Sequence, residues 1–135
     1  MTEIDCASAK TILLVEDDNV VRELTAEVLS EFGYRVHALR DGPSALDFLR
    51  STQQVDLLMS DIGLPGMDGR ELVEAARQLR PTLSVLFASG YDERELLEEV
   101  RARDSTAATG SIVKPYDLKV LASRLAELTD QGGGI

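Results

Sequence analysis

Residues 55–69 read VDLLMSDIGLPGMDG, and this stretch decides the fold. Residues 55–60 are apolar apart from Asp56 and Ser60, which is typical of a strand buried on both faces of a parallel sheet. A loop rich in glycine and proline begins directly after Asp61. Because ligands of open α/β sheets collect at the carboxyl ends of the strands, we expect the Asp61 carboxylate to face a crevice at that edge.

Short apolar runs alternate with helical patterns on both sides of this stretch. Strands are predicted at residues 11–16, 35–39, 55–60, 83–88 and 110–113, and helices at 19–32, 42–50, 69–79, 92–103 and 118–128. Five strand–helix units in a row are typical of an α/β fold with a five-stranded, parallel, doubly wound sheet and right-handed crossovers. The second strand is the most polar, since His37 stands between Val36 and Ala38, and we expect it at an edge of the sheet.

Apolar faces and capping residues support the predicted helices. Residues of the first helix recur at helical spacing on one face, which we expect to pack on the sheet: Val20, Val21, Leu24, Val28 and Leu29. In the last helix the leucines recur every three to four residues, at positions 118, 121, 125 and 128. Asp18 and Asp68 are expected to cap the first and third helices, and Asp41-Gly42-Pro43 to form a turn and a helix start.

The length and composition describe a single acidic domain. The chain has 135 residues, of which 44% are hydrophobic, enough for one core. We expect the domain over residues 11–129, between a flexible leader at 1–10 and a flexible Gly-rich tail at 130–135. The net charge of −10 argues against direct contact with nucleic acid, and local basic residues such as Arg77, Arg80, Arg101 and Arg103 do not change this.

Several classes of site are excluded by residues that the chain lacks. Cys6 is its one cysteine, so an intramolecular disulfide and a cysteine metal cluster are excluded. His37 is its one histidine, which excludes a His-based triad or zinc site, and we expect this residue on the surface. No stretch approaches the roughly 18 apolar residues of a membrane span, and residues 1–5 do not begin a signal peptide. Membrane insertion is not expected, and the cytoplasm is the expected location.

Polar side chains follow four of the predicted strands at their carboxyl ends. The first strand ends in Glu16-Asp17-Asp18. The third is followed by Asp61, the fourth by Ser89 and the fifth by Lys114. Because the carboxyl ends of parallel strands meet at one edge of a sheet, we expect these side chains to lie close together.

This mixture of groups is suited to phosphoryl chemistry. Two carboxylates about 4 Å apart repel by roughly 4 kcal/mol at an effective dielectric near 20, so such a group binds a cation or takes up protons. All the candidate ligands are hard oxygens, so Mg²⁺ is the expected cation, with positions left for phosphate oxygens. Lys114 and Ser89 are suited to contact those oxygens, and Asp61 to attack phosphorus.

The motifs resemble those of a response regulator receiver domain of two-component signalling, over about residues 11–129. The resemblance rests on VEDD at residues 15–18, MSDIGLPGMDG at 59–69, ASGY at 88–91 and VKPY at 113–116. It implies a chemotaxis-regulator-like fold, a flavodoxin-like (βα)5 three-layer sandwich with strand order 2-1-3-4-5.

The resemblance also implies a role for each acidic residue. Asp61 corresponds to the phosphoacceptor of the family. Glu16 and Asp17 correspond to the acidic pair that positions Mg²⁺, with Asp17 a direct ligand and Glu16 acting largely through water. The backbone carbonyl of Gly63 corresponds to a further ligand of the metal.

Two further residues match the family, and one position departs from it. Ser89 corresponds to the hydroxyl that turns toward the phosphoryl group, and Lys114 to the family's invariant lysine, whose bond to the next proline is cis there. Three residues before this lysine the family usually has an aromatic residue that switches its orientation, whereas this chain has Ser111. We therefore expect the face made by the fourth helix and fifth strand to signal differently.

The implied function is a phosphorylation-dependent signalling switch. A sensor histidine kinase or a histidine phosphotransfer protein would pass a phosphoryl group to Asp61, and the altered face would bind a downstream protein target. Such a domain is not a conventional enzyme, although it can catalyse its own phosphorylation and dephosphorylation. No output domain is recognised after residue 129, and the sequence leaves a homodimer open.

Other interpretations remain beside this one. The chain could be the receiver segment of a hybrid kinase or larger regulator, or a pseudo-receiver that binds a partner without phosphorylation. An aspartyl-phosphate hydrolase would need a second aspartate where Gly63 stands. A flavodoxin-like cofactor carrier would need a phosphate-binding loop where Glu16-Asp17-Asp18 repel phosphate.

Overall fold

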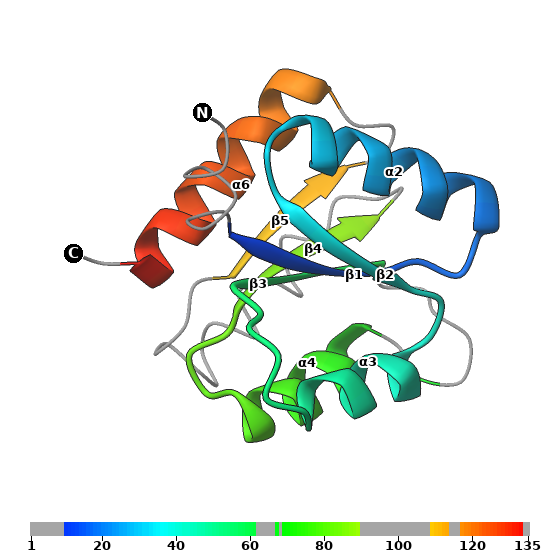
Figure 1. Ribbon diagram of the computed structural model, residues 1–135, viewed down its shortest axis with the longest axis vertical. Helices are drawn as coiled ribbons and strands as arrows, with labels where there is room; N and C mark the ends of the chain where they lie inside the picture. The colour runs from blue at the N-terminus through cyan, green and yellow to red at the C-terminus, as the bar shows by residue number, and fades with distance from the viewer. Residues whose placement is uncertain (1–9, 62–66, 68, 90–108, 114–116, 134–135) are drawn as a thin grey trace.

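Five strands form one parallel sheet in the order β2-β1-β3-β4-β5 (Figure 1). The computed structural model describes residues 10–61, 67, 69–89, 109–113 and 117–133. The described elements are β1 (Thr11–Val15), α2 (Asn19–Glu31), β2 (Arg35–Leu39), α3 (Gly42–Leu49), β3 (Leu57–Asp61), α4 (Gly69–Leu79), β4 (Ser84–Ser89), β5 (Thr109–Val113) and α6 (Leu118–Gly133). The predicted fold class and strand order are confirmed, and β2 lies at an edge as expected.

Helices cover both faces of the sheet. In Figure 1, α2 and α6 lie on one side of the strands, and α3 and α4 lie on the other. Alternate residues of β1 serve the two cores: Leu13 and Val15 pack with α3 and α4, whereas Ile12 and Leu14 pack with α2 and α6. This burial on both faces explains why the central strands are continuous apolar runs. Within the part of the chain that the structure describes, no helix is both long and apolar enough to cross a membrane.

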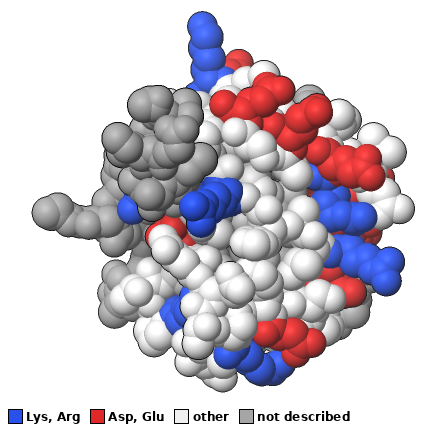
Figure 2. All heavy atoms as spheres, viewed as in Figure 1, with Lys and Arg blue, Asp and Glu red and all other residues white. Residues whose placement is uncertain are grey.

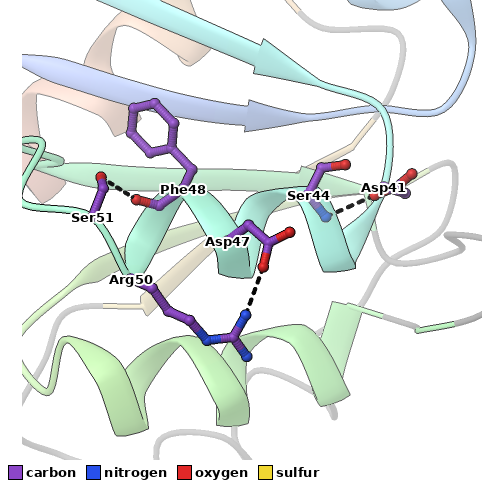
Figure 3. A network of polar contacts seen from close by, with 6 residues as sticks. All are labelled: Asp41, Ser44, Asp47, Phe48, Arg50 and Ser51. Atoms are coloured by element: carbon purple, nitrogen blue, oxygen red, sulfur yellow. Dashed lines mark hydrogen bonds and ion pairs between the residues drawn. The ribbon is translucent and has the colours of Figure 1, made fainter.

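Local signals fix where the helices begin and end. The Asp18 carboxylate accepts a 3.0 Å hydrogen bond from the Val21 amide and caps α2, as predicted. The Asp41 carboxylate accepts a 2.8 Å bond from the Ser44 amide at the start of α3 (Figure 3). Gly33 follows α2 with a φ of +100°, a conformation that glycine adopts at little cost. The predicted cap at Asp68 lies outside the described residues.

Strand β3 begins at Leu57, two residues after the predicted start at Val55. The Asp56 amide donates a 2.8 Å hydrogen bond to the Thr11 carbonyl, and its carboxylate accepts a 2.7 Å bond from the Thr11 amide. The carboxylate of Asp56 thus takes the place of a backbone carbonyl, and the regular ladder starts after it. At its other end β3 includes Asp61.

Helix α6 continues to Gly133, whereas we predicted its end at Leu128. No proline interrupts the segment after Leu128, and the Thr129 hydroxyl donates a 2.7 Å hydrogen bond to the Leu125 carbonyl within the helix. Residues 130–133 therefore belong to α6. The other described elements match their predicted bounds to within one residue. The helix predicted at 92–103 and leader residues 1–9 lie outside the described residues.

The predicted apolar face of α2 is only partly correct. The residues of α2 that are buried on the sheet are Thr25 and Leu29, whereas Val20 is 65% exposed and Leu24 is 58% exposed. Val20 and Leu24 are four residues apart and share a side of the helix that faces away from the sheet. Leu118, at the start of α6, is likewise 54% exposed, although the other three leucines of its repeat are buried.

His37 is more enclosed than a surface residue. It is half-buried on β2, and its ring centroid lies 4.6 Å from that of Phe48 on α3. The expectation of a simple surface position is therefore wrong, because α3 covers this side of the edge strand.

Candidate functional site

Three carboxylates meet at the carboxyl edge of the sheet. Asp61 is the last residue of β3 and is half-buried. Ser60 is paired with Val15, the last residue of β1, so Glu16 and Asp17 follow β1 at the same edge. Each of the three acids places a carboxylate oxygen within 4.8 Å of the other two. The predicted meeting of acids from two strands is thus observed.

Glu16 is the most enclosed of the three acids, at 4% exposed. Its amide donates a 3.0 Å hydrogen bond to the Leu39 carbonyl, which ties it to the end of β2. Its carboxylate accepts a 3.2 Å bond from the Asp18 amide. Its carbonyl accepts a 3.0 Å bond from the Arg22 guanidinium. Sequence reasoning missed Arg22, because the Glu16 carbonyl comes within reach of its guanidinium only in the folded chain.

The donor set fits Mg²⁺. All three side chains offer hard oxygen atoms, and oxygens bound to one Mg²⁺ lie at most about 4.2 Å apart, twice the usual bond length of about 2.1 Å. The oxygens here lie within 4.8 Å of one another, and Asp17 is exposed. Small rotations, or one bridging water, would complete the site. The enclosed Glu16 suits an indirect contact through water better than a direct one.

The sheet register places one further predicted residue, Ser89, by its backbone. Ala88 is paired with Asp61, and Ser89 follows Ala88 as the last residue of β4. Ser89 is paired with Val113, the residue directly before Lys114. Ser89 therefore ends its strand at the same edge as Asp61. Lys114 itself and Gly63 lie outside the described residues, as does the predicted cis bond after Lys114.

Ser111 occupies the middle of β5, where it is half-buried and paired with Phe87 of β4. Phe87 is fully buried in the core on the side of α3 and α4. The position three residues before Lys114 thus carries a small hydroxyl side chain on β5 and not an aromatic ring.

Charged side chains of both signs gather at one side of the molecule. Figure 2 shows acidic side chains at the upper right, over α2, and basic side chains below them at the right. The exposed acids of α2 are Glu23, Glu27 and Glu31.

The chain matches the family model described as the response regulator receiver domain, over residues 12–126. One relative of similar length is the response regulator receiver protein CpdR of Brucella abortus (strain 2308). It is 33% identical over 120 residues, which cover 88% of this chain and 96% of CpdR. The match with the sensor kinase CckA of the same organism, 34% identical, covers 94% of this chain and only 13% of the kinase.

Solved structures give the same family. A CheY-like response regulator receiver domain protein from Methanospirillum hungatei JF-1 superposes with a TM-score of 0.79 at 30% identity, covering 93% of this chain and 97% of that one. The receiver domain of the hybrid histidine kinase CckA superposes with a TM-score of 0.72 at 34% identity, covering 88% and 98%. With its sheet order, its acidic edge and these matches, the chain belongs to the response regulator receiver domain family.

Proposed function

We propose that the chain is a phosphorylation switch in which Asp61 accepts a phosphoryl group from a phosphohistidine. The observation that carries this proposal is the meeting of Glu16, Asp17 and Asp61 at one strand edge, with oxygens within 4.8 Å of one another. An aspartate without acidic neighbours would lack the additional oxygen ligands that bind Mg²⁺ next to a phosphoacceptor. The membership of the receiver family supports a signalling role for this arrangement.

In the proposed reaction, a carboxylate oxygen of Asp61 forms a bond to phosphorus while the bond from phosphorus to the donor imidazole nitrogen breaks. The electron pair of the broken bond stays on the imidazole, which takes up a proton. The β3–β4 ladder fixes the backbone of Asp61, which would help to align its carboxylate with the phosphorus atom. Mg²⁺ held by Glu16, Asp17, Asp61 and the Gly63 carbonyl would supply positive charge to the phosphoryl oxygens.

Ser89 and Lys114 complete the proposed site. Lys114, one residue beyond the partner of Ser89, would offer a compact positive charge to the phosphoryl oxygens. The hydroxyl of Ser89 would donate to one of those oxygens and draw its loop toward Asp61. That movement would bias the face formed by residues 92–103 and β5 toward a downstream protein target. With Ser111 on β5, this output would rely on Ser89 and its loop instead of on a swinging aromatic ring.

The exposed apolar residues beside the site are suited to dock the phosphoryl donor. A hollow between α2 and α6 is lined by Leu24, Thr25, Val28, Leu118 and Leu121. Both helices follow a strand, so their first turns stand at the carboxyl edge that carries Asp61. A sensor kinase or phosphotransfer protein bound in this hollow would present its phosphohistidine to that edge. The phosphoryl group of such a donor comes from ATP, so we propose that the transfer takes place in the cytoplasm.

The lifetime of the phosphorylated state is a separate part of the proposal. In the family, the residues two positions after the phosphoacceptor and after the hydroxyl tune the access of water, and here they are Gly63 and Tyr91. Tyr91 would shield the phosphoryl group, whereas Gly63 would leave space for water. The chain would catalyse its own dephosphorylation at a rate set by this balance.

The protein context is proposed from the relatives. The chain spans about one eighth of the length of the sensor kinases that it matches, yet nearly the whole of CpdR. It would therefore act either as a separate regulator or as the receiver segment of a larger protein. A pseudo-receiver that is never phosphorylated is less well supported, because all three acids are present and meet.

Phosphorylation followed by intact mass tests the proposal. The protein is incubated with Mg²⁺ and acetyl phosphate, and separately with a phosphorylated histidine phosphotransfer protein. We expect one added phosphoryl group on the wild type and none on Asp61→Asn. Asp47→Asn is a matched control, because this aspartate is exposed on α3 and pairs with Arg50 away from the site (Figure 3). The proposal is wrong if the wild type stays unmodified by both donors, or if Asp61→Asn is modified as fully as the wild type.

A further inference from the structure

Arg22 reaches from α2 back to the loop that carries two of the three carboxylates. Its Nη1 donates a 3.0 Å hydrogen bond to the Glu16 carbonyl, and its Nη2 donates a 2.6 Å bond to the Asn19 side-chain oxygen. Its own amide donates to the Asp18 carbonyl at 2.9 Å in the first turn of the helix. One half-buried side chain thus joins the end of β1 to the start of α2.

Further hydrogen bonds hold the same loop. The Glu16 amide is bound to Leu39, the Asp18 amide to the Glu16 carboxylate, and the Asp18 carboxylate to the Val21 amide. Together with Arg22, these bonds fix the direction in which residues 16 and 17 project. Because a peptide plane is rigid, holding the Glu16 carbonyl also sets the orientation of the Asp17 amide, which begins the next residue.

Opposing electrostatic effects act on the charge of Arg22, since the nearby carboxylates attract it. A cation near the N-terminus of a helix opposes the helix dipole. A cation near a binding site for Mg²⁺ also repels the metal. Whatever the balance of these charges, the hydrogen bond to the Glu16 carbonyl is a direct contact of Arg22 with the loop, and the bond to Asn19 holds the guanidinium at the start of α2.

We propose that Arg22 is a positioning residue that holds the β1–α2 loop so that Glu16 and Asp17 face Asp61 and bind Mg²⁺. The proposal rests on the proposed function only for the identity of the cation. Two opposite expectations separate it from a purely electrostatic role. If Arg22 acts through its charge, its removal strengthens Mg²⁺ binding, whereas if Arg22 positions the loop, its removal weakens binding. Residues that orient metal ligands typically change metal affinity by about 10- to 100-fold.

Mg²⁺ titration by calorimetry tests the sign of the effect. The proteins compared are the wild type, Arg22→Gln, Arg22→Lys and Arg50→Gln. Arg50 is the matched control, since it is an exposed arginine that pairs with Asp47 at the far end of α3 (Figure 3). We expect about 10-fold weaker binding for Arg22→Gln, a smaller loss for Arg22→Lys, which keeps one donor, and no change for Arg50→Gln. Equal or tighter binding by Arg22→Gln overturns the proposal.

A second measurement tests the positioning role without any metal. Amide hydrogen exchange of residues 16–18 in metal-free protein is expected to be faster in Arg22→Gln than in the wild type, with unchanged exchange in β4. Unchanged exchange at residues 16–18 overturns the proposal. If the wild type itself binds no Mg²⁺, the metal part of the proposed function fails, and this exchange still decides the role of Arg22. If Arg22→Gln does not fold, the same two measurements are read on Arg22→Lys.

Discussion

The Arg77 guanidinium donates a 2.9 Å hydrogen bond from Nη2 to the hydroxyl of Thr109, 32 residues away in the sequence. The same guanidinium donates to the Leu83 carbonyl from Nε at 3.1 Å and from Nη2 at 3.0 Å. Arg77 is 7% exposed. One buried side chain of α4 therefore joins the start of β4 to the start of β5, at the edge of the sheet opposite to Asp61.

Replacement of Arg77 is expected to destabilise the fold without touching the site. Arg77→Met keeps much of the apolar stem but leaves the Leu83 carbonyl and Thr109 hydroxyl without their donor, at an expected cost of about 2–4 kcal/mol in the free energy of unfolding. Thr109→Val removes one acceptor and should cost about 1–3 kcal/mol. Urea unfolding measures both values. Arg124→Ala is the control, because this arginine is 49% exposed, and a change within about 0.5 kcal/mol is expected. A loss for Arg77→Met no larger than that of the control would contradict this account.

The sheet could be predicted because each strand carries its own signal. Buried parallel strands are continuous apolar runs, and a polar residue at the end of each marks the carboxyl edge. That rule predicts that Asp61 meets Glu16 and Asp17, as the structure shows. The start of β3 could not be predicted in this way, because Asp56 uses its carboxylate as an acceptor for the Thr11 amide, which depends on how β1 lies beside it.

The two structural arginines could not be predicted from their neighbours in sequence. Arg77 is buried because acceptors from Leu83 and Thr109 come together only in the folded sheet. Arg22 depends on a carbonyl six residues earlier, across a strand end. The exposed side of α2 was also missed. Helical spacing groups Val20 and Leu24 with the buried residues, and only the packing on the sheet shows which part of that broad face is covered.

The acidic site should destabilise the metal-free protein. Glu16, Asp17 and Asp61 repel one another in the absence of a cation, so Asp17→Asn is expected to raise the free energy of unfolding without Mg²⁺ by about 1 kcal/mol. The stabilisation of the wild type by added Mg²⁺ should be largely lost in this variant. Thermal unfolding with EDTA and with Mg²⁺ measures both effects. The control, Asp47→Asn, lies outside the site and should show neither. A lower melting temperature of Asp17→Asn in EDTA would count against repulsion at the site.

Asp41 should make part of the stability depend on pH. Hydrogen bonds from Ser44, first from its amide and then from its hydroxyl, lower the pKa of Asp41 below its ordinary value of 3.8, with a smaller contribution from Arg40. A carboxyl group whose pKa is lower in the folded state stabilises it at higher pH, and this contribution is lost as the pH falls below 3.8 through the folded pKa. We expect Asp41→Ala to have a lower melting temperature than the wild type at neutral pH, with a difference that narrows in acid. Asp41→Asn, which keeps a capping oxygen, should melt close to the wild type at neutral pH. A difference for Asp41→Ala that stays constant into acid would show that ionised Asp41 is not the source.

The hollow between α2 and α6 should control the rate of phosphotransfer from a protein donor and not the chemistry at Asp61. Leu24 lines this hollow and is 58% exposed, so Leu24→Ser is expected to cost little stability while removing apolar area from the docking surface. Loss of a central apolar contact in an interface typically costs more than about 1 kcal/mol, so we expect a rise of about 10-fold in the KM for a phosphorylated histidine kinase. Histidine kinases are purified from the host, and the kinase that transfers its phosphoryl group fastest to the wild type serves as the donor. Small-molecule phosphorylation by acetyl phosphate should be unchanged, because acetyl phosphate needs no docking surface.

Leu79→Ser is the matched control, since this leucine is 39% exposed at the end of α4 on the other side of the sheet. Equal KM values for Leu24→Ser and Leu79→Ser would place the donor elsewhere, and equal losses with acetyl phosphate would show damage to the site instead of to docking.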